Sequence, residues 1–153
     1  MEENEFVSLR TKAESAYSTF GEVQCPFLET KIIFNAKGLD HIKFKQWNKA
    51  RNRNDQIIRL QLVHLAPKVL KKSHTVQGIE SGKKFERIKI NSRWEMKMTH
   101  VTYYEFIAVM EKCRIRVIVK QINDAQPYFW SIIPYWKQGT LGKKLFSGTP
   151  EID

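Results

Sequence analysis

Few features of secreted or membrane-embedded proteins occur in this sequence. Only two of its 153 residues are cysteine, Cys25 and Cys113, and both are isolated. This excludes a CxxC metal knuckle and a disulfide framework, and buried free thiols are expected instead. No apolar run approaches the ~20 residues of a membrane span, and the N-terminal segment MEENEF is acidic where a secretory signal is basic. We therefore expect a soluble, cytoplasmic protein with no membrane partner.

The sequence is also poor in clustered metal-binding side chains. His64 and His74 have no cysteine or third histidine at ligand spacing, which disfavours a zinc site. The basic part of the chain has no carboxylate cluster of the kind that holds two catalytic metal ions. His64 is expected to pack between helices and His74 to lie in a loop. We expect no metal and no cofactor.

The sequence has a large excess of positive charge. The formal net charge is +10, yet residues 1–30 hold six acids against two bases, so residues 31–153 carry +14. Residues 31–72 alone contain eleven Lys or Arg and two acids. Such a field attracts polyanions and releases counterions from phosphates on contact. The charge predicts RNA as the partner, and the plain alternative is a soluble surface that happens to be basic.

Length and composition predict one folded domain. Hydrophobic residues make up 42% of the chain and aromatic residues 12%, against 27% charged, which is enough apolar material to close a core. A chain of 153 residues fits a single domain. Within it we expect an N-terminal helical extension (1–29), the main body of the fold (30–136) and a glycine-containing, loosely held tail (137–153).

The first half of the chain has helical periodicity. The pattern predicts an amphipathic helix over 5–20, a strand over 30–34, and a short helix from the cap Asn35 to about residue 46. A basic loop over 47–54 then leads to a helix that is capped by Asn54 and ends near Ala66, because the residue before Pro67 is biased out of the helical region.

The second half has strand periodicity. Strands are predicted over 75–79 and 84–90, joined by a turn at residues 80–82, and then over 99–110, 114–121 and 128–133. Helices followed by an antiparallel meander predict an α+β fold, with the N-terminal helices packed on one face of a twisted antiparallel sheet. The other face is then expected to be free.

The period of two in strand 114–121 puts Arg114, Arg116 and Lys120 on that free face. One choice of register brings Ser131 to the same side. Basic residues beside aromatic rings suit RNA, because bases stack on rings while cations hold phosphates. For Trp130 a core position is favoured over base stacking, whereas Tyr104 fits either role.

Several segments together resemble a known group of proteins. They are IIFNAKGLDHIKFK (residues 32–45), the basic RNR after it, the helix that ends in a proline, and the terminal hairpin VIVKQINDAQPYFWSIIPY. In this order they resemble the barnase, EndoU, colicin and RelE (BECR-fold) ribonucleases, closest to the phage-borne and polymorphic-toxin branch. The resemblance covers residues 30–136, and it rests on layout more than on strict motifs.

The resemblance implies a metal-independent ribonuclease of toxin type. His41, Arg53 and Ser131 match the pattern of a histidine on the first core helix, a basic residue after it and a hydroxyl on a late strand. Lys43, Lys45 and Arg51 are alternatives in the same segment. RNA supplies its own 2′-hydroxyl nucleophile, so cleavage needs a base, a cation for the phosphorane and an acid, and leaves a cyclic phosphate.

We therefore expect His41 as base or acid, Arg53 as the stabilising cation, and Ser131 and Tyr104 as positioning groups. RNA binding is expected from Lys43, Lys45, Arg51, Arg116 and Lys120. Which group is acid and which is base stays open, and an acidic antitoxin or immunity protein is a further expected partner. Glu105, an acid within a predicted strand, is expected to pair with a cation. The alternative from another class is a non-catalytic RNA- or DNA-binding module with a basic sheet face.

Overall fold

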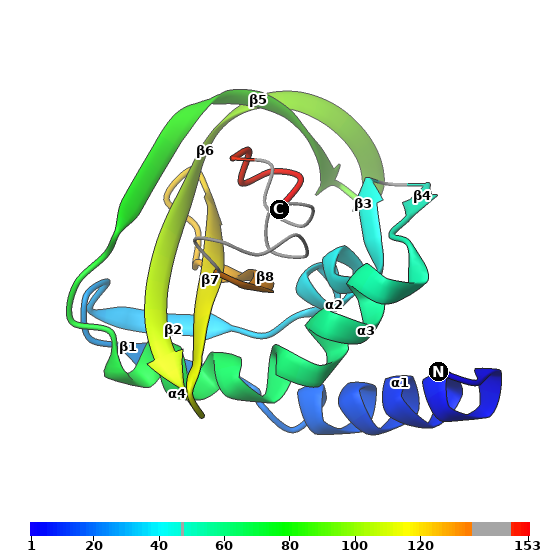
Figure 1. The fold of residues 1–153 in the computed structure, drawn as a ribbon. Coiled ribbons are helices and arrows are strands. Elements are labelled where there is room, and N and C mark those ends of the chain that lie inside the picture. Colours follow the sequence, from blue (N-terminus) through cyan, green and yellow to red (C-terminus); the bar gives the residue numbers. More distant parts are fainter. Residues whose placement is uncertain (47, 136–147) are drawn as a thin grey trace.

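A computed structural model describes residues 1–46, 48–135 and 148–153 (Figure 1). Its helices are α1 (Glu3–Tyr17), α2 (Ala36–Lys43), α3 (Arg53–Leu62) and α4 (Ala66–Lys72), with a 3-10 turn η1 (Val63–Leu65) between the last two. Its strands are β1 (Glu22–Cys25), β2 (Thr30–Ile33), β3 (Phe44–Gln46), β4 (Lys49–Ala50), β5 (Gly78–Ile90), β6 (Arg93–Met110), β7 (Cys113–Ile122) and β8 (Tyr128–Pro134).

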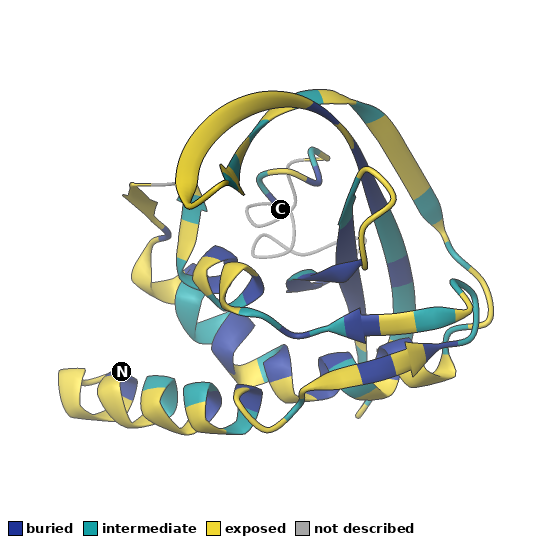
Figure 2. Cartoon of the chain, turned by 180° about the vertical axis from the view of Figure 1, so that it is seen from behind, coloured by how far each residue is buried: buried dark blue, intermediate teal, exposed yellow. Residues whose placement is uncertain are grey.

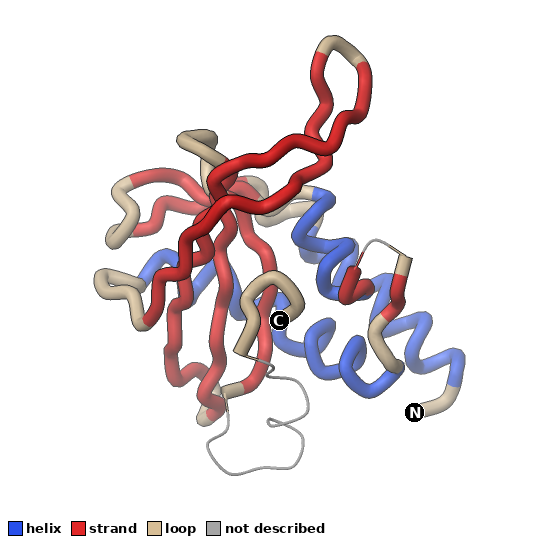
Figure 3. Tube along the Cα trace, turned by 90° about the horizontal axis from the view of Figure 1, so that it is seen from above, coloured by secondary structure: helices blue, strands red, loops and turns tan. Residues whose placement is uncertain are grey.

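Six of these strands form one sheet, in the order β1-β2-β8-β7-β6-β5. Neighbouring strands are antiparallel except β2 and β8, which run parallel, and β3 pairs with β4 in a separate small ribbon. The helices lie together on one side of the sheet (Figure 3). The predicted α+β class, with helices on one face of a mainly antiparallel sheet, is confirmed.

The main hydrophobic core lies between the helices and the sheet. Phe106, Val117, Val119, Phe129 and Ile132 point from the three central strands toward the helices, and all are fully buried. Figure 2 shows the buried residues concentrated in these strands and on the inner sides of the helices. Full burial of one such side chain contributes about 1.5–3 kcal/mol, so this layer is the main source of stability.

One long hairpin, β5–β6, departs from the predicted layout. The turn expected at residues 80–82 is wrong, because Ser81 lies within β5 and its hydroxyl hydrogen-bonds Thr102 on β6 (3.0 Å). The chain turns instead at Asn91 and Ser92, both with positive φ (49° and 65°), as a two-residue hairpin loop of the I′ type requires. The hairpin arches over the side of the sheet away from the helices (Figure 1), and its end projects beyond the other strands (Figure 3).

The helical half also differs in detail. Asn35 caps α2 as predicted, since its side chain accepts from the Gly38 N–H, but α2 ends at Lys43. The cap of α3 is Asn52 and not Asn54. The helical path continues past Pro67, because Pro67 sits in the first turn of α4, where its missing N–H costs no hydrogen bond. His64 is half exposed, so its predicted packing role is wrong.

The sheet face opposite the helices is not free. Residues 148–153 lie inside the arch of β5–β6 (Figure 1), and Asp153 is 1% exposed. The indole N–H of Trp130 donates to the Pro150 carbonyl (3.0 Å). The expected loosely held tail is therefore wrong for residues 148–153, while residues 136–147 lie outside the described residues. Within the described residues, no helix is long and apolar enough to cross a membrane.

Candidate functional site

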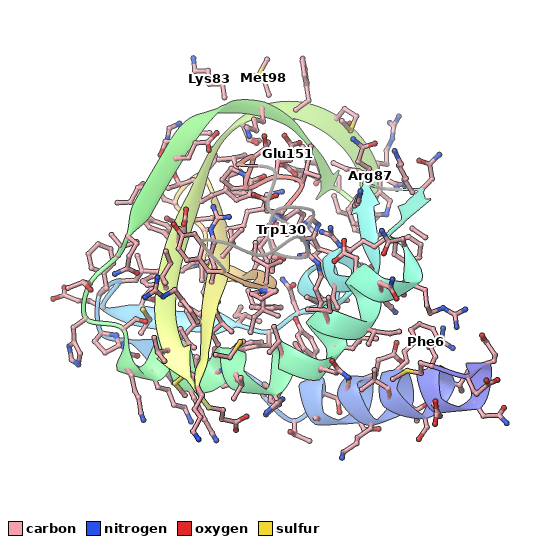
Figure 4. All side chains as sticks on the ribbon, in the orientation of Figure 1. Phe6, Lys83, Arg87, Met98, Trp130 and Glu151 are labelled. Atoms are coloured by element: carbon pink, nitrogen blue, oxygen red, sulfur yellow. The ribbon has the colours of Figure 1, made fainter. Side chains whose placement is uncertain are left out.

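A cavity of about 570 Å³ opens on the concave side of the sheet, between α2, β3, the outer half of β5 and residues 151–152. Its lining combines cations (Lys37, Lys45, Arg87, Lys120), acids (Asp40, Glu86, Glu151), aromatic rings (Phe44, Phe85, Tyr128, Trp130) and the polar or apolar residues His41, Gln46 and Ile152. Trp130 and Glu151 lie inside the arch, whereas Lys83 and Met98 point outward from it (Figure 4). We call this the concave cavity.

Helix α2 brings His41 to the cavity because it packs unusually close to β8. A Cβ atom on Gly38 would lie 2.3 Å from the Phe129 carbonyl oxygen and 2.7 Å from the Tyr17 hydroxyl. Only glycine therefore allows this approach. The Tyr17 hydroxyl also donates to the Asn35 carbonyl (2.6 Å), which fixes the start of the helix.

A β-bulge in β8 turns the neighbouring side chains of Trp130 and Ser131 toward the same side of the sheet, the concave side. Phe129 pairs with Val119, but Ser131 pairs with Ile118, so Trp130 is the extra residue between these pairs. The Trp130 ring stacks on His41 with centroids 3.9 Å apart and planes 18° apart. Lys120 Nζ lies 4.2 Å from the same ring centroid. The bulge thus joins α2, β7 and β8 at one aromatic contact.

Behind the cavity lies a group of buried charges, which we call the arginine cluster: Arg51, Arg59 and Arg116 with Asp55, Glu105 and Asp153. Asp55 bridges two of the arginines, at 2.5 Å from Arg59 Nε and 3.4 Å from Arg51 Nη1. All three of these side chains are at most 4% exposed. Burial lowers the pKa of Arg51 to about 10, with Arg59 adding repulsion and Asp55 opposing it. Burial lowers the pKa of Arg59 as well.

Arg116 and Ser131 complete the cluster from the sheet. Arg116 lies 2.7 Å from Glu105 and 3.3 Å from the Asp153 carboxylate. The Ser131 hydroxyl accepts from Arg59 Nη1 (2.6 Å) and donates to the main-chain oxygen of Asp153 (2.5 Å). The expected pairing of Glu105 with a cation is confirmed. The attraction between paired charges offsets much of the cost of removing them from water, which explains why this sheet face accepts arginine.

His41 is 4% exposed and engaged at Nε2 by Arg51 Nη2 (2.9 Å). A guanidinium has only donors, so Nε2 is the acceptor and the ring proton lies on Nδ1. Burial holds the pKa of His41 well below 6.5, and the charges of Arg51, Arg59 and Lys120 lower it further. His41 is therefore neutral at pH 7, with the lone pair of Nε2 already used.

Lys120 and Glu86 form the ion pair that faces the cavity. Their charged atoms are 2.8 Å apart, and the side chains are 5% and 15% exposed. Burial lowers the pKa of Lys120, although Glu86 opposes this effect. The hydroxyls of Tyr103 and Tyr128 are buried nearby and have no hydrogen-bond partner among the described residues. Burial raises the pKa of both tyrosines, so each hydroxyl stays protonated as a hydrogen-bond donor.

The structure brings some of the predicted site residues together and separates others. His41, Lys45, Arg51, Arg116, Lys120 and Ser131 all lie at the cavity or in the arginine cluster behind it. The predicted register that puts Ser131 on the side of Arg116 and Lys120 is confirmed. The expectation that Arg116 and Lys120 form an exposed basic surface is wrong, because both are buried and ion-paired.

Arg53, Tyr104 and Lys43 lie away from the cavity. Arg53 pairs with Glu3 on α1 (2.6 Å) and sits over the Phe6 ring (4.0 Å). Tyr104 pairs with Val119 and packs on the helix side of the sheet, where its hydroxyl donates to Gln121. Lys43 binds Glu14 (3.1 Å). Their own contacts thus keep all three away from the concave face.

Sequence reasoning missed Glu86, Phe44 and Phe85. Phe44 and Phe85 are 38% and 63% exposed and line the cavity. Each is preceded by lysine and lies in a strongly charged stretch, KFK and KKFER. An aromatic residue embedded in charge is a usable signal for an exposed ring. Asp55 and Arg59 were missed too, although their i, i+4 spacing is typical of an ion pair on a helix.

Within residues 1–46, 48–135 and 148–153, no three His, Cys, Asp or Glu side chains gather in a way that could hold a metal ion. Comparison with family models, with curated proteins and with solved structures finds no match to this chain.

Proposed function

We propose that the chain is a metal-independent ribonuclease that binds RNA in the concave cavity and cleaves it by attack of the 2′-hydroxyl. The observation that carries this proposal is the Glu86–Lys120 pair, a carboxylate and an ammonium 2.8 Å apart in a cavity lined by further cations and exposed rings. A groove that only binds RNA gains nothing from acids facing the phosphates, whereas cleavage requires a base there.

RNA binding is assigned to the rim of the cavity. Lys37, Lys45 and Arg87 provide charge for the phosphates, and the exposed ring of Phe44 provides a surface on which a base stacks. Trp130 is not available for stacking in the same way, because His41 and Lys120 already contact its ring.

The proposed reaction uses the ion pair as base and acid. Glu86 takes the proton of the 2′-hydroxyl, O2′ attacks phosphorus, the P–O5′ bond breaks, and Lys120 gives its proton to O5′. The products are a 2′,3′-cyclic phosphate and a 5′-hydroxyl, and a proton passing from Glu86 to Lys120 restores the pair. Lys37, which lines the cavity, is the cation assigned to stabilise the phosphorane oxygens. The resemblance to BECR-fold ribonucleases supports the same class of reaction.

In this proposal His41 is a positioning residue. Its Nε2 is occupied by Arg51, and its ring supports Trp130, against which Lys120 lies. This differs from the expectation that His41 is the base or acid, and one experiment separates the two assignments.

The test is cleavage of a defined RNA in EDTA by the wild-type chain, E86Q, H41Q and the matched control D124N, which changes an exposed turn. E86Q should lose about 10²-fold or more in rate with RNA affinity unchanged or tighter. A 2′-deoxy substitution at the cut site should block cleavage. Wild-type activity in E86Q with loss in H41Q would restore His41 as the base. Strict dependence on added magnesium or manganese would overturn the metal-independent mechanism.

A non-catalytic RNA-binding module is the second candidate. It is favoured by the engagement of His41 Nε2 with Arg51, which leaves no histidine base in the cavity. It predicts salt-sensitive RNA binding with no cleavage products. Under either function, an acidic antitoxin or immunity protein that covers the cavity is a proposal from charge complementarity alone.

A further inference from the structure

The contacts of Asp153 are those of a bound anion. Its main-chain oxygen accepts hydrogen bonds from Arg59 Nη1 and from the Ser131 hydroxyl. Its carboxylate accepts from the Gly148 N–H (3.1 Å) and lies 3.3 Å from Arg116 Nη1. Two oxygen groups of one residue thus meet two guanidinium groups and a hydroxyl. Arginine and hydroxyl donors in this arrangement are the usual partners of phosphate oxygens.

Charge balance requires an anion at this position. Among the described residues, Arg51, Arg59 and Arg116 form ion pairs with two carboxylates besides Asp153, those of Asp55 and Glu105. Asp153 supplies the third negative charge. Without it, one guanidinium charge would stay uncompensated where water is largely excluded, which is strongly unfavourable.

The cluster also holds a donor that Asp153 does not use. Arg59 is fully buried, and its Nη2 has no hydrogen-bond partner among the described residues. A carboxylate and a carbonyl offer their oxygens in fewer directions than the tetrahedral set of a phosphate group. A phosphate in the place of Asp153 could therefore satisfy this remaining donor as well.

Residues 148–153 are held mainly by polar contacts that ligand oxygens could replace. None of these residues belongs to either hydrophobic core cluster or to the sheet. Their other polar contacts include the Ile152 carbonyl with Arg51 (2.8 Å), the Pro150 carbonyl with Trp130 (3.0 Å) and Glu151 with Lys84 (3.4 Å). Glu151 and Ile152 also line the concave cavity.

We propose that Arg59, Arg116 and Ser131 form an oxyanion site, that Asp153 fills it from within the chain, and that a phosphate group exchanges with Asp153 there. Because residues 151–152 form a wall of the concave cavity, this exchange also opens the cavity. The contacts and charges of Arg59, Arg116, Ser131 and Asp153 support the oxyanion site by themselves. Only the inference that the exchange controls access of RNA to the cavity rests on the proposed function.

The experiment measures thermal unfolding of the whole chain in chloride and in inorganic phosphate at matched ionic strength. In D153N the shape of the side chain is kept and its charge removed. D153N should be less stable than wild type in chloride and should gain roughly 3 °C or more in Tm when phosphate replaces chloride. Wild type, whose site is filled, should gain clearly less. D124N is the matched control, since it makes the same chemical change in an exposed turn.

The double variant D153N/R116Q locates the effect. Loss of the phosphate response in the double variant supports the oxyanion site, whereas a retained response would mean binding elsewhere and overturn it. Equal responses of D153N and D124N would overturn it too. If D153N is unfolded in chloride, recovery of its circular dichroism in phosphate supports the site, and no recovery overturns it. The assay contains no RNA, so its failure and a failure of the ribonuclease proposal are distinguishable.

Discussion

On the face of the sheet that meets the helices, Phe106, Val117 and Phe129 form an apolar layer, whereas on the concave face the same strands carry Arg116, Lys120 and Ser131. All six residues are at most 4% exposed. One sheet therefore buries hydrocarbon on one side and charge on the other, and neighbouring residues of a strand belong to opposite sides.

The difference lies in what each side contributes. Apolar contacts are non-directional and supply stability in proportion to the area they bury. Buried ion pairs contribute little net stability, because their attraction mainly offsets the cost of removing them from water. They do fix the positions and protonation states of their members. We infer that the helix side holds the fold together, while the concave side keeps a set of charged groups in place for function.

The largest expected effect is that of removing one member of the arginine cluster. Asp55→Ala leaves Arg51 and Arg59 buried without their shared carboxylate. The free energy of unfolding should fall by about 3–5 kcal/mol, as much as a large core truncation on the helix side. Urea denaturation measures this loss.

Replacing Asp55 and Arg59 together by Leu and Met tests the same contacts without breaking the charge balance. Because this removes one cation and one acid and leaves Arg51 and Arg116 with Glu105 and Asp153, the double variant should recover much of the lost stability. If Asp55→Ala stayed within about 1 kcal/mol of wild type, the concave charges would not be buried as described.

A smaller effect is expected from the protonation of His41. Its pKa is depressed in the folded state, so the unfolded chain binds the extra proton first. The contribution of His41 to stability is thus fully present above pH 6.5 and is lost as the pH falls toward the folded pKa. Below pH 6.5 the loss approaches about 1.4 kcal/mol per pH unit.

Urea denaturation of wild type and H41Q between pH 7.5 and pH 5 tests this. The free energy of unfolding should fall less between pH 7.5 and pH 5 in H41Q than in wild type. The difference between the two proteins is the stability that wild type loses when His41 is protonated. Parallel pH profiles for the two proteins would show that His41 is not held neutral on the concave side.

The smallest effect is expected at Arg53, which belongs to neither face of the sheet. Its ion pair with Glu3 is 47% and 68% exposed, and such pairs contribute no more than about 1 kcal/mol. Arg53→Ala should leave RNA affinity and cleavage near wild type. Arg87→Ala, the same change at the cavity rim, should weaken RNA binding. A large loss of activity in Arg53→Ala alone would move the functional site away from the concave face.

Local patterns in the sequence predicted a good part of this protein. The cap at Asn35, the order of helices before strands and the period of two that aligns Ser131 with Arg116 and Lys120 all depend on neighbours along the chain or on strand geometry. The +14 charge of residues 31–153 depends on composition alone. Such features do not require knowledge of distant contacts.

The tertiary structure decided which charges are buried and which residues share the cavity. Arg53 and Arg59 lie on one helix, but only Arg59 faces the sheet, where it donates hydrogen bonds to Ser131 and Asp153. Glu86 meets Lys120 only because β5 and β6 pair over thirteen positions and arch back over the sheet. Residue 153 contacts Arg116 across 37 positions of sequence. Each of these contacts joins distant segments, and a local pattern carries no information about which distant charge will neutralise a buried one.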